Sequence, residues 1–455
     1  NEFNLNKYIH TYIHKIMSNL KINFNQIGIF FVTSLILFTA IRNISLIYYL
    51  IIFLILLYYL IKKLHYVFIF DYDRILFQLF FYFTLFLCAW SFLFISNDVV
   101  YLSDFRDNNS TVYENVAINP LIGIPRLLLM PILAFLFVNL LDSKKNFLVM
   151  IRVILLCYVA AALSIAYQIY FNQQIPWFTD SHMRGGYIRY ASLLGSLSIY
   201  GSVAGYAIIA IFSPKILENH ILKYALAIII SAAAIFSLTK TGVIMVVSAF
   251  LLMAINYGAI NFKKLIYLLF SIFIFGIISY LIVSNNDYLL NYLNTVLNFT
   301  FGSQWTLSNP DGIKYINDTP QITFDYIIHR LTQFSSGSFD YYGLDIFLFG
   351  VGVWGGAGVM GYPDGVSSHS GLIDLLIIGG PIYISLFLIL YLRVQIYFVK
   401  NLREDLNIFF FISNILFIFN MVFISGSSFQ PSISIFFWLS VAYYIYSIKK
   451  LKQEY

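Results

Sequence analysis

The stretch Ile44–Ile61 reads ISLIYYLIIFLILLYYLI and contains no charged side chain. As an α-helix it would be about 27 Å long, close to the thickness of the hydrocarbon layer of a bilayer. A second run, Leu265–Val283, has the same character. Uncharged apolar runs of this length predict transmembrane helices.

The composition of the whole chain agrees with this prediction. Of its 455 residues, 60% are hydrophobic and only 11% are charged, against about 25% charged in an ordinary soluble domain. So few charges cannot cover the surface of a water-soluble globule. The sequence therefore predicts an all-α polytopic membrane protein.

Runs of about 17 or more mostly apolar residues predict about twelve membrane-spanning helices. The expected helices start near Ile27, Ile44, Ile75, Leu121, Phe147, Tyr190, Leu222, Thr241, Leu265, Gly371, Ile408 and Pro431. Twelve spans put both ends of the chain on the same side of the membrane.

The Lys and Arg residues predict which side that is. All but eight of the 27 fall on the side of the termini, and an excess of cations in short loops marks the cytoplasmic side. Both termini are therefore expected in the cytoplasm. The other eight cations fall on the opposite side or near that face of a helix, and their positions need another explanation. They are Arg42, Arg106, Arg126, Arg184, Arg189, Lys240, Lys314 and Arg330.

The spans divide the chain into three expected regions. Residues 1–284 hold helices one to nine with short loops, 285–369 form a long outer loop, and 370–455 hold helices ten to twelve and a cytoplasmic tail. The long loop is rich in aromatic residues, so we expect a folded subdomain with short helices near Asp287–Phe299 and Thr323–Phe334.

The sequence favours neither a metal nor a cofactor. Cys88 and Cys157 both lie inside apolar runs, so they cannot build a disulfide framework or a cysteine metal site. Asp71-Tyr72-Asp73 has the Asp-x-Asp spacing of metal-dependent sugar transferases, but no further ligands accompany it on its short loop, and we interpret it as a solvated face. The net charge of +6 is spread along the chain, which argues against a nucleic-acid partner.

His369 is the first candidate for catalysis. It lies in Ser367-Ser368-His369-Ser370-Gly371, where the long outer loop enters the tenth expected helix. A histidine with an ordinary pKa near 6.5 is largely neutral at pH 7 and can accept a proton. The alternative is an interfacial histidine that bonds to a loop carbonyl.

The outer cations are candidates for binding an anion. Arg184 and Arg189 precede the sixth expected helix, Arg330 lies on an expected loop helix, and Lys240 interrupts an apolar run. Guanidinium groups match phosphate oxygens in pairs, so a diphosphate is the natural ligand. The alternative for Lys240 and Arg126 is that they reach toward lipid phosphates.

A glycine-rich stretch, Phe349–Gly358, comes shortly before His369. Gly350 and Gly352 would let the backbone turn tightly or approach a ligand closely. No Lys-Ser/Thr pair follows, so the stretch is not a nucleotide-binding loop. A simple tight turn is the alternative.

The C-terminal half resembles the O-antigen polymerase and ligase family of bacterial envelope enzymes. The resemblance rests on Gly350-Val351-Gly352 and on the pattern His369, Ser370, Gly380 and Tyr383, which has the family's spacing. Upstream, Thr239-Lys240-Thr241-Gly242 is similar to the family's Ser-Arg-x-Gly with Lys in place of Arg. Arg184 with Gly195 fits a polymerase spacing, and Arg189 with Leu193 fits a ligase spacing.

The resemblance implies a GT-C-like fold and a metal-independent, inverting transfer of a glycan from an undecaprenyl-diphosphate carrier to a sugar hydroxyl. His369 would then deprotonate the acceptor, and Arg330 would act with Arg184, Arg189 and Lys240 on the diphosphate. It further implies the periplasmic face of the bacterial inner membrane, with membrane lipid and a chain-length regulator protein as partners.

Three functions stay open at this point. The first is a polymerase that joins the repeat units of a surface polysaccharide, and the second is the ligase that transfers finished glycan to lipid A core. The third, from another class, is a polysaccharide flippase or transporter. Transporters usually bind substrate near the bilayer midplane between repeats, whereas the candidate residues here collect at the outer face.

Overall fold

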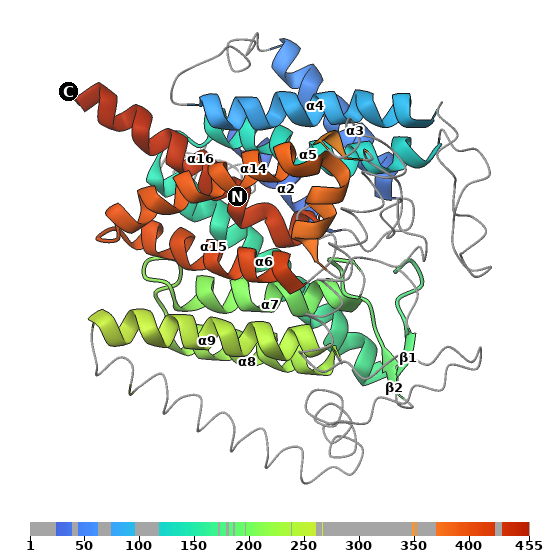
Figure 1. Cartoon of the computed structure of the whole chain (residues 1–455). Helices are drawn as coiled ribbons and strands as arrows, with labels where there is room; N and C mark the ends of the chain where they lie inside the picture. Colours follow the sequence, from blue (N-terminus) through green and yellow to red (C-terminus); the bar gives the residue numbers. More distant parts are fainter. Residues whose placement is uncertain are drawn as a thin grey trace, which may run out of the picture.

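The computed structural model describes residues 24–38, 44–61, 74–95, 118–171, 173–178, 182–184, 187–195, 197–237, 239–260, 266, 348–350, 352, 370–423 and 430–454 (Figure 1). In this part of the chain the structure is a bundle of helices with one short hairpin. Of the predicted outer loop, 285–369, only 348–350 and 352 are described. Both predicted loop helices therefore lie outside the described residues.

The helices of the described part are α2 (Phe24–Leu37), α3 (Ile44–Ile61), α4 (Ile75–Ile95), α5 (Ile118–Leu140), α6 (Lys144–Phe171), α7 (Leu197–Phe212), α8 (His220–Phe236), α9 (Lys240–Ile260), α14 (Gly371–Lys400), α15 (Asp405–Phe423) and α16 (Pro431–Glu454). The strands are β1 (His182–Arg184) and β2 (Tyr187–Arg189), which pair antiparallel.

Among the described residues, six helices are long and apolar enough to cross a membrane: α4, α5, α6, α14, α15 and α16. Shorter apolar helices lie within α2, α3, α7, α8 and α9. These lengths and compositions confirm the prediction of a helical membrane protein. The predicted starts at Ile44, Ile75, Gly371 and Pro431 coincide with observed helix starts.

The predicted start of the sixth span at Tyr190 is wrong, because α7 begins only at Leu197. Before it, the backbones of Ser192 and Gly195 exchange two hydrogen bonds of 3.1 and 2.9 Å. The hydroxyl of Ser164 on α6 accepts a third bond from the Leu193 N–H at 3.0 Å. A polar group on a neighbouring helix thus satisfies a backbone donor here, so this apolar segment is stable without being helical.

Contacts between helix termini define the two ends of the bundle. The Ser370 hydroxyl, at the start of α14, donates to the Met421 carbonyl near the end of α15. The neighbouring Asn420 donates to Ser202, in the first half of α7, and to Tyr206, near its middle. We call this the hairpin end, because the chain that leads from β2 into α7 lies here (Figure 1).

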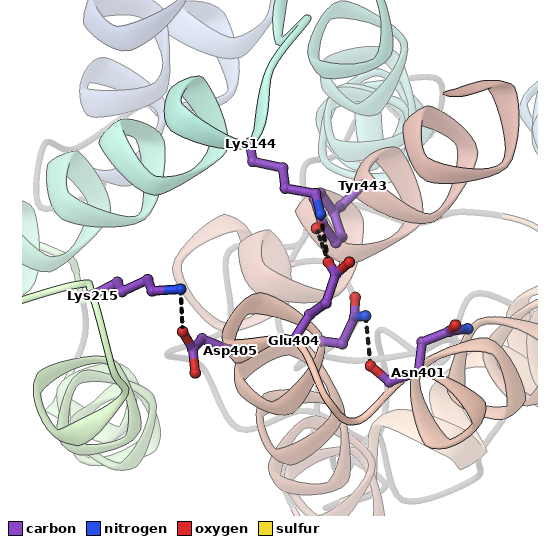
Figure 2. A network of polar contacts seen from close by, with 7 residues as sticks. Lys144, Lys215, Asn401, Glu404, Asp405 and Tyr443 are labelled. Carbon is purple, nitrogen blue, oxygen red and sulfur yellow. Dashed lines mark hydrogen bonds and ion pairs between the residues drawn. The ribbon is translucent and has the colours of Figure 1, made fainter. Parts of the chain in front are cut away.

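The opposite end is the ion-pair end. Lys144, the first residue of α6, lies 2.7 Å from Glu404, and Lys215, in the α7–α8 loop, lies 2.8 Å from Asp405 (Figure 2). Arg152 on α6 donates to the carbonyls of Lys215 and Ile216. These contacts join the start of α6, the end of α7 and the start of α15.

Helices α7 and α9 run parallel and pack closely through glycine. A Cβ added at Gly201 would overlap the Thr239 hydroxyl and lie 2.8 Å from the Gly242 nitrogen, and one at Gly205 would lie 2.7 Å from the Met245 carbonyl oxygen. Small residues four apart let helices approach in a membrane, where burial of apolar surface does not drive association. The close packing of α7 and α9 therefore holds the start of α9 at the hairpin end.

α9 begins at the hairpin end, and so does α14. The predicted helix near Leu265 lies between them in the sequence, and only residue 266 of it is described.

Polar side chains inside the bundle bind one another. Asn414 on α15 donates to the Ser440 hydroxyl of α16 at 3.0 Å, and Tyr391 on α14 donates to the Asn414 carbonyl at 3.1 Å. Gln395 donates to the Tyr391 hydroxyl at 3.1 Å. Hydrogen bonds of this kind hold transmembrane helices in register.

Candidate functional site

The structure describes only part of the predicted site. His369 and Arg330 lie outside the described residues. For Arg184, Arg189 and Lys240 the backbone is described but the side chain is not, whereas Gly350, Gly352 and Gly380 are described fully.

α14 is two helical parts joined by a break, and its first part lies at the hairpin end (Figure 1). The break is at Gly380, whose φ is 66° and ψ −174°. Pro381 follows, which has no backbone N–H to donate and cannot continue the helix from the preceding turn. The dipeptide Gly380-Pro381 thus ends one helical part and begins the next.

The glycine-rich segment packs into this break. Gly350 and Gly352 have φ values of 72° and 81°. The Gly352 N–H donates to the Ile378 carbonyl at 3.0 Å, and the indole of Trp90 on α4 donates to the Gly350 carbonyl at 2.9 Å. Within the described residues, these glycines approach the protein's own backbone closely.

Tyr383 attaches the second part of α14 to α4. Its ring stacks on Phe80 with a centroid distance of 4.9 Å, and its hydroxyl lies 3.1 Å from that of Thr84. The positions that carry the His-centred pattern thus have local roles: Ser370 precedes the first part of α14 and bonds to α15, Gly380 breaks the helix, and Tyr383 fixes the second part.

Asp374 is a residue that the sequence reasoning missed. It lies in the first turn of α14 and is only 1% exposed. Of the Asp, Glu, Lys, Arg and His side chains that the structure describes, only that of Asp374 is buried. The signal was present in the sequence, because Asp374 is the single charge in the run Gly371–Leu392. An ionisable residue inside an apolar span indicates a functional site.

The hairpin β1–β2 carries the two predicted arginines. Its register pairs His182 with Arg189, and Arg184 with Tyr187. Cross-strand partners share a face of a ribbon, and so do residues two apart. His182, Arg184, Tyr187 and Arg189 therefore occupy one face, which has a cationic and aromatic composition.

α6 anchors both flanks of this hairpin. The Gln168 amide donates to the Ala191 carbonyl at 2.8 Å, and its carbonyl oxygen accepts from the Ile175 N–H at 3.2 Å. Gln168 itself is fully buried. One side chain thus holds the chain before β1 and after β2 at the end of α6.

Lys240 is the first residue of α9 and not the middle of a span. Thr239 precedes it, and the Thr239 hydroxyl accepts from the Gly242 N–H at 3.1 Å. The hydroxyls of Ser237 and Thr239 lie 2.9 Å apart. These short polar side chains satisfy the helix terminus, so the chain turns between α8 and α9 and brings Lys240 to the hairpin end.

Two further features bear on the chemistry. In the described part of the chain, no group of three or more His, Cys, Asp and Glu could hold a metal ion. Cys88 on α4 and Cys157 on α6 are buried and form no disulfide. A cavity of about 560 Å³ lies elsewhere, between α4, α14 and α16, and it contains none of the predicted site residues.

No protein-family model matches this chain, and no curated protein matches it either.

Proposed function

We propose that the chain is a GT-C-like membrane glycosyltransferase with twelve spans, which polymerises the repeat units of an O-antigen or another surface polysaccharide. The observation that carries the proposal is the broken helix α14. Its Ser370, Gly380 and Tyr383 fit the His-centred pattern, and each has a distinct role in α14, the helix that follows His369 in the sequence.

The proposed diphosphate ligands belong to elements of the same end. Arg184 and Arg189 share a face of the hairpin, which α6 anchors, and Lys240 begins α9. The start of α14 lies at that end too. With Arg330 from the long loop, these cations would surround a lipid-linked diphosphate.

In the proposed reaction, His369 accepts the proton of the acceptor sugar hydroxyl. The acceptor oxygen attacks the anomeric carbon of the donor from the face opposite the diphosphate. The bond between that carbon and the diphosphate oxygen breaks, and the leaving diphosphate takes the electron pair. Arg330, Arg184, Arg189 and Lys240 stabilise the negative charge as it develops.

The proposed donor is an oligosaccharide on undecaprenyl diphosphate, which presents its activated bond at the periplasmic face of the bacterial inner membrane. The hairpin end then faces the periplasm, and both termini face the cytoplasm. No cofactor is needed, because the activated bond is already in the donor. A chain-length regulator is a fitting protein partner for a polymerase.

The ligase is the second candidate. The His369, Ser370, Gly380 and Tyr383 pattern leans to ligases, whereas Arg184 with Gly195 leans to polymerases. The flippase or transporter is supported less. The buried ionisable side chain of the described residues, Asp374, lies in the first turn of a helix, at one end of the bundle, and not between repeats at the midplane.

The test is a reconstituted reaction. Purified protein in liposomes is incubated with a lipid-linked repeat unit alone, and the products are separated by size. A ladder of longer chains without any lipid A acceptor supports the polymerase. Products only when lipid A core is present identify the ligase, and no new glycosidic bond with either acceptor overturns the enzyme proposal.

His369→Ala is expected to lower the rate at least about 100-fold, as removal of a general base does. The matched control is His220→Ala, which changes the exposed first residue of α8 and should leave the rate unchanged. Full activity of His369→Ala would rule out its role as the base.

A further inference from the structure

The cavity of about 560 Å³ between α4, α14 and α16 is a groove on the outside of the bundle. Its floor consists of buried apolar side chains such as Phe77 on α4, Leu390 on α14 and Ile445 on α16. Its rim is exposed, because Ile389 and Leu392 on α14 keep 48% and 55% of their surface accessible. In a helix bundle that spans a membrane, a groove with a buried floor and an exposed apolar rim opens toward lipid.

The rim follows one face of the second part of α14. Its exposed lining residues are Ile389, Leu392, Arg393 and Ile396. Spacings of three, four and seven residues from Ile389 put them on one side of the helix. From first to last they extend about 10 Å, which is about a third of the hydrocarbon layer of a bilayer. This apolar length accommodates part of an acyl chain.

One charge lies in this apolar groove. Among the described residues that line it, Arg393 is the charged one, and none is Asp or Glu. The Arg393 Nε donates to the hydroxyl of Tyr444, a lining residue on α16, at 3.2 Å. A hydroxyl is neutral, so this bond orients the guanidinium toward α16 without offsetting its charge. The groove is therefore complementary to a ligand that combines an apolar chain with an anionic group.

The charges around the groove have the same sign. Arg74 and Lys449 each adjoin a lining residue in the sequence, and both lie at the ends of helices that form the groove. The carboxylates of Glu404 and Asp405, at the same end, pair with lysines from the start of α6 and from the α7–α8 loop (Figure 2). The composition beside the groove thus favours an anionic ligand.

The depth of Arg393 indicates where that anion comes from. Arg393 lies seven residues before Lys400, the last residue of α14, which is about 10 Å along a helix. The charged residues 403–405 follow directly, so the chain leaves the hydrocarbon layer there. A long cationic side chain near the end of a span lays its stem on apolar surface and extends its charge toward the headgroups. The phosphates of the headgroup layer are the anions at this level.

We infer that the groove binds an anionic phospholipid of the leaflet at the ion-pair end, with its phosphate at Arg393 and an acyl chain along the apolar floor. A planar guanidinium can bind two phosphate oxygens at once. A phosphatidylcholine headgroup carries a quaternary ammonium beside its phosphate, so the cations around the groove disfavour it. The groove lies at the opposite end of α14 from the proposed glycan site, and the inference does not depend on the proposed function.

A lipid titration tests this site. Delipidated protein in detergent receives phosphatidylglycerol or phosphatidylcholine, its melting temperature is followed, and native mass spectrometry counts the bound lipids. One phosphatidylglycerol should bind and, at about 100-fold excess over its dissociation constant, raise the melting temperature by a few degrees more than phosphatidylcholine does. Arg393→Gln should weaken the binding of phosphatidylglycerol at least about tenfold, because a charge-assisted bond is lost.

A matched variant separates this arginine from the general charge of the region. Arg403 is exposed at the same end but does not line the groove, so Arg403→Gln should keep the preference for phosphatidylglycerol. Arg393→Lys keeps the charge without the planar fork, so a weaker preference should remain, and it replaces Arg393→Gln if that variant does not fold. Equal responses of Arg393→Gln and Arg403→Gln, or no preference between the lipids in wild type, would overturn the site.

A second pair of variants tests the groove itself. Ile389→Trp enlarges an exposed rim residue and leaves Arg393 in place, so it should remove the phosphatidylglycerol preference by filling the path of the acyl chain. Val399→Trp is the control, because Val399 is similarly exposed on α14, at 49%, but does not line the groove. Full preference in Ile389→Trp would mean that Arg393 contacts bulk lipid without any groove-bound molecule.

Two further measurements address other occupants. Inorganic phosphate should leave the melting temperature of wild type unchanged, and a rise equal to that with phosphatidylglycerol would make the groove a free-anion site and overturn the lipid. Light scattering of the delipidated protein should show the same mass for wild type and Ile389→Trp. A dimer of wild type that Ile389→Trp abolishes would assign the groove to a second copy of the chain.

Discussion

Gly380 is the residue on which the shape of α14 depends. Its backbone has a φ of 66° and a ψ of −174°, a conformation that essentially only glycine adopts and that costs a residue with a side chain about 1–3 kcal/mol. A Cβ at this position would also overlap the Leu348 carbonyl oxygen. The break in α14 and the packing of the segment at Leu348 against it therefore both depend on Gly380.

Gly380→Ala is expected to destabilise the protein by about 2–4 kcal/mol, because backbone strain adds to displacement of the Leu348 carbonyl. Thermal unfolding in detergent measures this change, and the transfer assay should lose activity with it. Gly28→Ala is the matched control, since no atom lies within 4 Å of a Cβ there. A melting temperature of Gly380→Ala equal to that of wild type would contradict the role of the break.

Lys215 has a pH-dependent role at the other end. Its hydrogen bond with Asp405, and then the charge of Asp405, raise the pKa of the Lys215 ammonium above its ordinary value. A raised pKa in the folded state means that the contribution to stability is complete below the ordinary pKa and is lost as pH rises through the folded value. Since the Lys215 side chain is largely exposed, salt should weaken the contribution as well.

The melting temperature should accordingly fall a little more steeply above about pH 10 in wild type than in Lys215→Gln, which has no ammonium to titrate. High salt should reduce the difference between the two proteins. Parallel pH curves at low salt would show that the ion pair contributes nothing measurable.

At the scale of elements, α7 and α9 act as one unit through their glycines. Gly201 and Gly205 on α7 leave room for the backbone at Gly242 and Met245. Because Lys240 lies two residues before Gly242, the separation of these helices decides where Lys240 is held. The glycines of α7 thus act on the candidate site without belonging to it.

Gly201→Ala should push the start of α9 away, since the atoms in its path include the Gly242 backbone. We expect a loss of stability of about 1–3 kcal/mol, as for overpacked cores, and a larger loss of transfer rate than of stability. Val247→Leu enlarges an exposed side chain of α9 and serves as the control. Unaltered stability and rate in Gly201→Ala would mean that α9 tolerates the shift.

Helix boundaries could be predicted from the sequence where they depend on residues nearby in the chain. Uncharged runs placed α3, α4 and α16, and the predicted start at Thr241 lies within one residue of the observed start of α9. The start of α7 could not be predicted, because it depends on Ser164, which lies on another helix. For the site, the five-residue spacing of Arg184 and Arg189 says nothing by itself, and only the strand register puts them on one face.

At the scale of the whole molecule, the two ends of the bundle differ in chemistry. The ion-pair end joins α6, the α7–α8 loop and α15 through Lys144, Lys215, Glu404 and Asp405 (Figure 2). The hairpin end carries the break in α14, buried Asp374 and the cationic face of β1–β2. Ion pairs at one end and a candidate site at the other fit a protein that works on one side of a membrane.

Labelling of single cysteines tests which side that is. Both native cysteines are buried, so Cys88→Ala and Cys157→Ala give a simple background. Trp177→Cys changes an exposed residue next to the hairpin, and Glu218→Cys changes an exposed residue of the α7–α8 loop. In intact spheroplasts, a membrane-impermeant maleimide should label Trp177→Cys and not Glu218→Cys, while both react after permeabilisation. The reverse pattern would place the hairpin end in the cytoplasm, where no lipid-linked donor could meet it after export.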